Sequence, residues 1–244
     1  MKKAILITAR LKSTRLPVKA LKEICGRPMI EHMIERLKLA QKPEVIILCT
    51  STVAQDDPLE EVAKKNGIYC YRGHPDDVLL RLTSAAEHFG IDTVISCTAD
   101  NPFVDPTYID KLVSYHQVKK HDFTKIEDLP FGTFSYALSY PAMVQACKLK
   151  KEIDTEVWGG YFTMTGKFVW GVMPVDDPEL RWPELRLTVD TADDFELVTQ
   201  IFKELYEPGK VFPLKQIVEL LHKRPDLVAI NSGVSQKQAL PIKI

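Results

Sequence analysis

The stretch that decides the fold is residues 4–32, AILITARLKSTRLPVKALKEICGRPMIEH. Its first five residues are continuously apolar, the pattern of a β-strand buried on both faces of a sheet. A loop follows that carries the cations Arg10, Lys12, Arg15 and Lys19. Apolar residues then recur at helical spacing over residues 29–37. The sequence therefore predicts a buried strand, a basic loop and a helix, in that order.

The alternation of strand and helix continues through the first half of the chain. Further strands are predicted at residues 45–49, 68–71 and 93–97, separated by apolar stripes of helical period around residues 59–63 and 78–86. This order is typical of a parallel α/β sheet flanked by helices. Ligands of such sheets bind beyond the carboxyl ends of the strands, which is where the basic loop begins.

The pattern changes after residue 115. Strand-like pieces at residues 123–124, 134–136 and 168–172 and a helix at 142–149 stand among prolines, glycines and tryptophans. We interpret residues 1–244 as one domain with a small inserted α+β lobe at about 121–183, which would serve an acceptor or a subunit contact. A last sheet strand is predicted at 185–189, followed by helices at 192–206 and 213–222. The tail after Arg224 has little pattern.

Composition limits the possible functions. The 32 basic and 33 acidic side chains give a net charge of −1, which argues against a general nucleic-acid surface. No apolar segment approaches membrane-spanning length. The five cysteines form no C-x-x-C pair and are odd in number, so we expect reduced, buried thiols in a cytoplasmic protein. The six histidines show no metal-ligand spacing, which makes a zinc site unlikely.

The basic loop suits an anion. Backbone N–H groups and the helix dipole at a strand-to-helix junction favour negative charge, and several cations with the hydroxyls of Ser13 and Thr14 suit a polyphosphate. Neither G-x-x-x-x-G-K-[ST] nor G-x-G-x-x-G occurs, so an ordinary Walker loop or dinucleotide fingerprint is not supported. The alternative is a charged, solvated loop without function.

Two aspartates follow predicted strands at distant positions. Asp100 stands in CTADNPFVDP and Asp190 in RLTVDTADDFELV. Magnesium prefers one or two carboxylates together with phosphate oxygens and water, so the pair could serve a metal-bound nucleotide. Their neighbours have structural tasks instead: Asp105 before Pro106 is typical of an N-cap, and Thr191 with Asp194 has the spacing of a capping box.

These motifs resemble a known family. A-R-x-x-S-T-R-L-P-x-K-x-L followed by G-R-P-M-I-E-H is similar to the opening of the cytidylyltransferases that activate sialic-acid-type sugars and 3-deoxy-manno-octulosonate, especially the spore-coat polysaccharide branch. The turns T-A-D-N-P and V-D-T-A-D-D match that family too. The resemblance implies a Rossmann-like, nucleotide-diphospho-sugar transferase fold and a site for the triphosphate of CTP. The residues that it assigns to nucleotide binding here are Ala9, Arg10, Ser13, Arg15, Lys19 and Asp100.

The resemblance also assigns Mg²⁺ to Asp100 and Asp190. One departure lies in the loop, where Val18 stands at a position at which relatives commonly have glycine; this bears on how closely the backbone approaches phosphate. A third segment, R-G-x-x-x-D-V-L-x-R, places Gly73, Asp77 and Arg81 beside the base or ribose. The alternative for Asp77 and Arg81 is an i, i+4 helical ion pair.

The function predicted is Mg²⁺-dependent transfer of CMP from CTP to an anionic sugar or sugar-like acceptor, with release of pyrophosphate, for surface polysaccharide or glycan synthesis. Arg10, Arg15 and Lys19 are the predicted catalytic cations, and a homodimer through the lobe is expected. The acceptor stays open, because IDTEVWGGYF at residues 153–162 lacks the histidine of the family's usual E-x-E-H segment. The alternatives are a nucleotide-sugar-dependent glycosyltransferase, against which the absence of Asp-x-Asp counts, and a non-catalytic nucleotide-binding protein.

Overall fold

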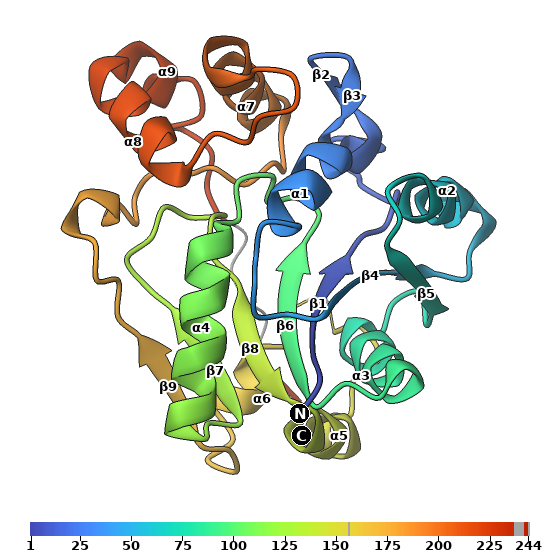
Figure 1. Cartoon of the computed structure of the whole chain (residues 1–244). Coiled ribbons are helices and arrows are strands. Elements are labelled where there is room, and N and C mark those ends of the chain that lie inside the picture. The colour runs from blue at the N-terminus through green and yellow to red at the C-terminus, as the bar shows by residue number, and fades with distance from the viewer. Residues whose placement is uncertain (156, 237–241, 244) are drawn as a thin grey trace.

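The strands predicted in the first half of the chain lie side by side in the structure, a computed structural model that describes residues 1–155, 157–236 and 242–243. Among these residues, seven strands form one sheet in the order β5-β4-β1-β6-β8-β7-β9 (Figure 1). The strands of this sheet are β1 (Lys3–Thr8), β4 (Val45–Ser51), β5 (Tyr69–Gly73), β6 (Thr93–Thr98), β7 (Phe123–Ile126), β8 (Tyr136–Ser139) and β9 (Trp170–Met173). The short pair β2 (Glu23–Ile24) and β3 (Arg27–Pro28) forms a separate hairpin.

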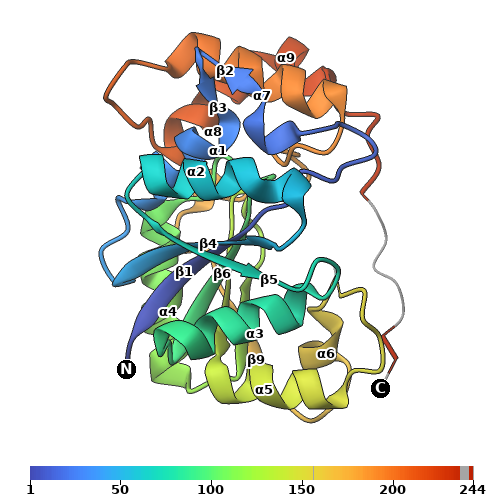
Figure 2. The same ribbon diagram turned by 90° about the vertical axis from the view of Figure 1, so that its right-hand side faces the viewer.

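Helices cover both faces of the sheet (Figure 2). The helices are α1 (Met29–Leu37), α2 (Asp57–Lys65), α3 (Val78–Phe89), α4 (Pro106–Lys119), α5 (Tyr140–Leu149), α6 (Gly160–Thr163), α7 (Ala192–Leu205), α8 (Leu214–Lys223) and α9 (Pro225–Ala229). Because side chains alternate along a strand, Ile5 and Ile7 pack with α1, α2, α4, α7 and α8, whereas Ala4 and Leu6 pack with α3, α5 and α6. The described helices include none long and apolar enough to cross a membrane.

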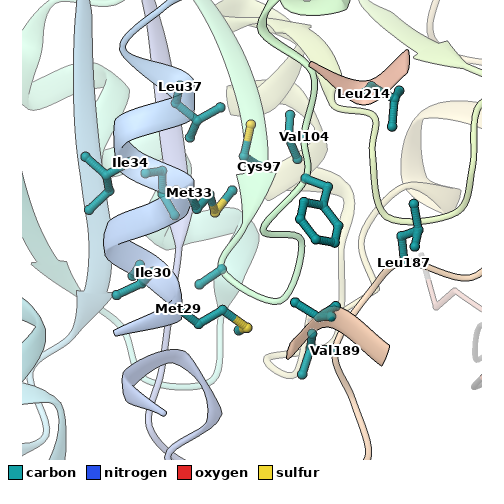
Figure 3. Close-up of a cluster of buried hydrophobic side chains, with 14 of the residues drawn as sticks. Met29, Ile30, Met33, Ile34, Leu37, Cys97, Val104, Leu187, Val189 and Leu214 are labelled. Carbon is teal, nitrogen blue, oxygen red and sulfur yellow. The ribbon is translucent and has the colours of Figure 1, made fainter. Parts of the chain in front are cut away.

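The larger core holds the site-bearing loops in place. Figure 3 shows α1 presenting Met33 and Leu37 toward a cluster that also contains Leu187 and Val189. These last two side chains are fully buried, although they lie just before the exposed start of α7. Burying a leucine or valine side chain is worth about 1.5–3 kcal/mol, so the segment before Asp190 is firmly anchored.

The sheet is mostly parallel, as predicted. β5, β4, β1 and β6 run parallel to one another, β8 is antiparallel to both β6 and β7, and β7 is parallel to β9. The segment at about 121–183 thus contributes β7, β8 and β9 to the main sheet, and its strands form no separate sheet among the described residues. Phe123 and Trp158 of this segment share a core cluster with Leu6 of β1, which explains how the segment is integrated.

Three predictions of local structure were wrong. Residues 185–189 are no sheet strand, because their backbone bonds with loops instead: Leu187 N–H donates to Phe131 O, and Val189 N–H to Asp100 O. The tail forms the short helix α9, which begins at Pro225 with proline in the first turn. Cys25 is exposed at a positive φ of 49° in the β2–β3 turn, whereas Cys49 and Cys97 are buried; all five thiols are free.

Candidate active site

Lys19 lies between the two predicted carboxylates. Its Nζ is 2.8 Å from Asp100 Oδ2 and 2.9 Å from Asp190 Oδ1, and it also donates to the backbone oxygen of Val189 at 2.9 Å. The three side chains come from the loop after β1, the turn after β6 and the segment before α7, 81 and 171 residues apart in sequence from Lys19. The structure therefore brings these predicted site residues together at the carboxyl ends of the strands.

Both carboxylates are positioned by backbone contacts between their own segments. Asp100 follows β6 directly, and its carbonyl accepts the Val189 N–H at 2.8 Å, so the two acid-bearing turns are joined through the backbone. Asn101 Nδ2 donates to Thr98 Oγ1 at 2.8 Å and closes the turn after β6. Because these backbones are already fixed, no further backbone ordering is needed to present the two carboxylates.

A buried network of ion pairs holds Asp190 through the carboxylate oxygen that Lys19 does not contact. Arg186 Nη2 donates to Asp190 Oδ2 at 2.9 Å, and the Arg186 guanidinium also contacts Asp194 through Nε at 2.8 Å and Nη2 at 3.0 Å. Asp194 accepts from the N–H of Asp190 and Thr191 and from Asn231 Nδ2 at 2.9 Å. The capping box of Thr191 and Asp194 is confirmed. Sequence reasoning missed Arg186 and Asn231, and no local pattern marked either residue, because residues 186–190 are not helical and a four-residue spacing carries no meaning there.

The charges of this cluster reinforce one another. Burial works against the charged form of Lys19, but Asp100 and Asp190 outweigh it and raise the pKa of Lys19 above its ordinary value. Burial likewise opposes the Asp190 carboxylate, yet Lys19, Arg15 and Arg186 lower its pKa. Lys19 and Asp190 are each only 12% exposed. Lys19 and Asp190 are therefore both charged at neutral pH in an environment where charge interactions are stronger than in water.

The loop backbone adopts an unusual conformation at Val18. This residue has φ 55° and ψ 26°, the left-handed region, and it immediately precedes the 3₁₀ turn η1 (Lys19–Leu21) that carries Lys19. A β-branched residue pays a steric cost in this region that glycine does not. The glycine that the resemblance led us to expect at this position would adopt this backbone without that cost.

The two arginines of the basic loop have partners in two different regions: Arg15 at Asp190 and Arg10 at the turn of residues 75–76. Arg15 Nη2 lies 3.1 Å from Asp190 Oδ1 and joins Lys19, with a side chain 42% exposed. Ser13 Oγ accepts from Leu16 N–H at 3.3 Å within the loop. Arg10 points elsewhere: its Nη1 donates to Pro75 O and lies 3.0 Å from Asp76 Oδ1. The structure does not bring Arg10 to the Asp100–Asp190 pair.

Gly73, Asp77 and Arg81 form a buried unit below the loop. A Cβ on Gly73 would approach Arg81 Cγ to 3.0 Å, so glycine permits the close packing of Arg81. Arg81 is 1% exposed and donates to the His74 and Pro75 carbonyls rather than to Asp77. Asp77 caps α3 by accepting from Leu80 N–H at 3.0 Å. The i, i+4 ion pair considered as the alternative is therefore replaced by other partners, and nucleotide contact by these residues stays a prediction.

Two further residues support the same region. Ala9 is buried at the end of β1 and donates its N–H to Cys49 O at 3.2 Å. Asp56, which sequence reasoning did not single out, is buried and accepts from Leu11 N–H at 2.7 Å and from the Ser51 hydroxyl. Its carboxylate thus ties the start of the basic loop to the end of β4. No sequence signal separated it from the adjacent acid at the start of α2.

The carboxylate oxygens of Asp100 and Asp190 fit a magnesium ion that takes its other ligands from the phosphates of a nucleotide. The described residues contain no group of three or more His, Cys, Asp or Glu side chains able to hold a metal alone. Asp100 Oδ2 and Asp190 Oδ1 nevertheless converge on one cation, the Lys19 ammonium. Magnesium commonly binds one or two carboxylates and takes its other oxygens from phosphate and water.

The segment after α5 combines buried and exposed side chains. Lys150 is only 9% exposed and pairs with Asp77. Ile153 and Val157 are 63% and 48% exposed. Glu156, noted in the comparison with the E-x-E-H segment, lies outside the described residues.

Comparisons with known proteins show the family of the chain. The cytidylyltransferase family matches residues 4–156. The spore coat polysaccharide biosynthesis protein SpsF of Bacillus subtilis is 27% identical over 91% of this chain and 94% of its own. An 8-amino-3,8-dideoxy-manno-octulosonate cytidylyltransferase of Shewanella frigidimarina is 32% identical over about half of each chain, 50% and 51%. A cytidylyltransferase structure from Leptospira borgpetersenii superposes with a TM-score of 0.85 at 25% identity, covering 99% of both chains. The chain belongs to the cytidylyltransferase family.

Proposed function

We propose that the protein transfers CMP from CTP to an anionic sugar or sugar-like acceptor and releases pyrophosphate. The observation that carries this proposal is the contact of Lys19 with both Asp100 and Asp190, three residues from distant segments that meet at the carboxyl edge of the sheet. A triphosphate needs positive charge, and its metal needs oxygen ligands. This cluster offers both within one site.

The proposed reaction places little covalent work on the protein. An acceptor oxygen attacks the α-phosphorus in line, the bond to the β-phosphate oxygen breaks, and pyrophosphate leaves. Arg15 and Lys19 neutralise the charge on the leaving pyrophosphate, and Arg10 supplies a third cation from the start of the loop. Positioning and electrostatic stabilisation then provide most of the acceleration.

Asp100 and Asp190 would hold Mg²⁺ against phosphate oxygens. When bound, this ion would supply Lewis-acid stabilisation of the phosphates and lower the pKa of an attacking hydroxyl. Lys19 holds the two carboxylates together by its own charge, and Arg186 fixes the second oxygen of Asp190. The protein thus keeps two acids close at a point where their mutual repulsion would otherwise separate them.

The acceptor class follows from the relatives and from one departure. The Shewanella relative is named for an octulosonate, a sugar acid, and SpsF for polysaccharide synthesis. Because residues 153–162 lack the family's histidine, a 2-keto sugar acid, a phosphorylated small molecule and a phosphonate are all included in the proposed class. The free thiols accord with a cytoplasmic setting, which fractionation of the source cells would test.

One assay tests the proposal. The four nucleoside triphosphates are crossed with a panel of sugar acids, sugar phosphates and phosphonates in the presence of magnesium, and released pyrophosphate is measured. We expect pyrophosphate with CTP and at least one anionic acceptor. Consumption of a finished nucleotide sugar without pyrophosphate would identify a glycosyltransferase instead. Tight CTP binding without product for any acceptor would identify a non-catalytic nucleotide-binding protein.

The same proposal includes a homodimer through residues at about 121–183. This segment carries the exposed apolar side chains Met164, Val169 and Trp170, with exposed fractions of 71%, 61% and 40%. Exposed apolar groups in one segment are typical of a protein contact. Sedimentation showing only monomer at micromolar concentration would contradict the dimer.

A further inference from the structure

The turn at residues 74–77 connects two parts of the proposed site. It follows β5 and leads into α3, and its two adjacent acids, Asp76 and Asp77, have different partners. Asp76 lies 3.0 Å from Arg10 of the basic loop. Asp77 pairs with Lys150 at the end of α5. One turn is thus held by the nucleotide loop and by the segment after α5.

The contact toward the basic loop is through the backbone as well as a carboxylate. Arg10 Nη1 donates to Pro75 O, and Arg81 Nη1 donates to the same carbonyl at 3.2 Å and to His74 O at 2.6 Å. Arg81 is almost completely buried, and its Nε has no hydrogen-bond partner in the described part of the chain. Because the buried guanidinium of Arg81 donates to two carbonyls of the turn, it fixes the turn in place, and Arg10 donates to one of the same carbonyls.

The contact toward the segment after α5 is fully buried. The side chains of Asp77 and Lys150 are 4% and 9% exposed. Thr155 Oγ1 donates to Asp77 Oδ1 at 2.9 Å, accepts from Leu79 N–H at 2.9 Å, and Thr155 N–H donates to Asp76 O at 3.3 Å. Asp77 therefore satisfies a lysine, a threonine and the helix N-terminus at once. Removing its charge would leave the buried Lys150 ammonium without its carboxylate partner, although Lys150 Nζ also donates to Glu152 O at 3.1 Å.

We propose that Asp77 is a positioning residue that sets the place of Arg10 for the triphosphate, with Lys150 and Thr155 fixing Asp77 from the segment after α5. Asp77 acts through the turn and does not touch the nucleotide. This inference rests on the proposed function, because it concerns CTP binding at the same site. It also assigns a task to residues 150–155, which differ from the family's usual acceptor segment. The side chains of Lys150 and Thr155 stabilise the turn that contacts Arg10 of the nucleotide loop.

A double-mutant cycle with CTP and magnesium as the probe tests this inference by calorimetry. We expect Asp77→Asn to weaken CTP binding by about tenfold, and Lys150→Met to have a similar effect from the other side. In an Arg10→Ala background, Asp77→Asn should cause no further loss, because the residue that it positions is gone. Amide exchange should rise at residues 74–81 and at residues 9–16 in the Asp77→Asn protein.

The matched control is Glu31→Gln. Glu31 has a side chain as buried as that of Asp77, 4% exposed, and pairs with Lys65 at 2.7 Å between α1 and α2. It should lower stability without changing CTP affinity. Thr155→Val provides a second, milder variant if Lys150→Met does not fold.

The outcomes separate the two proposals. Additive losses in the cycle would mean that Asp77 contacts the nucleotide directly, and unchanged affinity in Asp77→Asn would mean that the turn does not position Arg10. Either result overturns the inference while leaving the proposed function intact. A wild-type protein that binds none of the four nucleoside triphosphates would overturn the proposed function itself.

Discussion

The two sides of the proposed site are built in contrasting ways. On the triphosphate side, Lys19 and Asp190 are nearly buried and pair with each other at 2.9 Å, and Arg186 donates to the second oxygen of Asp190 at 2.9 Å. On the acceptor side, the exposed surface that carries Ile153 and Met164 leaves these side chains 63% and 71% exposed. Lys150 of the same segment is buried against Asp77 and belongs to the fixed side. The first side is fixed before any ligand arrives, and the second presents apolar surface to solvent. Preorganised charge suits the invariant part of the chemistry, whereas an open surface suits an acceptor or subunit that differs among relatives.

The largest expected effect is at the centre of the triphosphate side. Lys19→Met should lower pyrophosphate release by about 100-fold or more, the scale for removal of a transition-state charge partner. Asp190→Ala should cause a comparable loss. Lys12→Met is the matched control, since Lys12 is an exposed cation of the same loop, and it should change turnover less than threefold. Near wild-type turnover in Lys19→Met would contradict the preorganised side of the comparison.

The Lys19→Met protein allows a second measurement without nucleotide. Lys19 competes with any cation for Asp100 and Asp190. Removing its charge should therefore strengthen Mn²⁺ binding to the protein alone, by about tenfold, in electron paramagnetic resonance titrations. Unchanged Mn²⁺ affinity would show that the two carboxylates are not the ligands.

A smaller effect, on stability, is expected for the ion pair between Arg186 and Asp194. Asp194→Asn should cost about 2 kcal/mol of unfolding free energy at pH 7, because Arg186 loses one of its two carboxylate partners. Burial opposes the Asp194 charge, but Arg186 outweighs it and lowers the pKa of Asp194 below its ordinary 3.8. The contribution is thus present above about pH 4 and is lost as the pH falls through the folded-state pKa.

Urea unfolding at several pH values checks this prediction. The difference between wild type and Asp194→Asn should shrink as the pH falls from 5 toward 2. Asp193→Asn, an exposed neighbour on the same turn of α7, should differ from wild type by no more than about 0.5 kcal/mol throughout. A constant difference across this range would show that the Arg186–Asp194 charge pair is not its source.

The same contrast explains what the sequence could predict. The strands of the first half, the basic loop and both acids were found because strand ends and charge are visible as local patterns. Arg186 was not found, because its segment has the composition of a strand and shows no sign of the turn that brings its side chain to Asp190 and Asp194. Asp56 was not found, because its partner is the Leu11 N–H, 45 residues away. Residues 185–189 have the composition of a sheet strand, yet their backbone pairs with Phe131 and Asp100. Periodicity shows that a segment is buried and extended, but not which segment it pairs with.

Substitution of Val18 tests whether the backbone of the basic loop is strained at this residue. Val18→Gly should raise the unfolding free energy by about 0.5–1 kcal/mol, since glycine relieves the cost of a left-handed φ of 55° and loses part of that gain to unfolded-state entropy. Val53→Gly is the matched control: Val53 is also an exposed loop valine before a 3₁₀ turn, but its φ is −72°, so glycine there should destabilise. Equal effects of the two substitutions would show that Val18 is not strained.

The smallest expected effect lies on the acceptor side. Ile153→Ser and Met164→Ser remove exposed apolar side chains that have no role in the Lys19 cluster, so CTP affinity should change less than twofold by calorimetry. If this surface receives the acceptor or a second copy of the chain, the same variants should raise the acceptor KM or weaken self-association in sedimentation, because each lost apolar contact removes favourable burial. A large loss of CTP affinity in either variant would show that the exposed surface and the triphosphate side are energetically coupled. The contrast between a fixed triphosphate side and an adaptable acceptor side would then no longer hold.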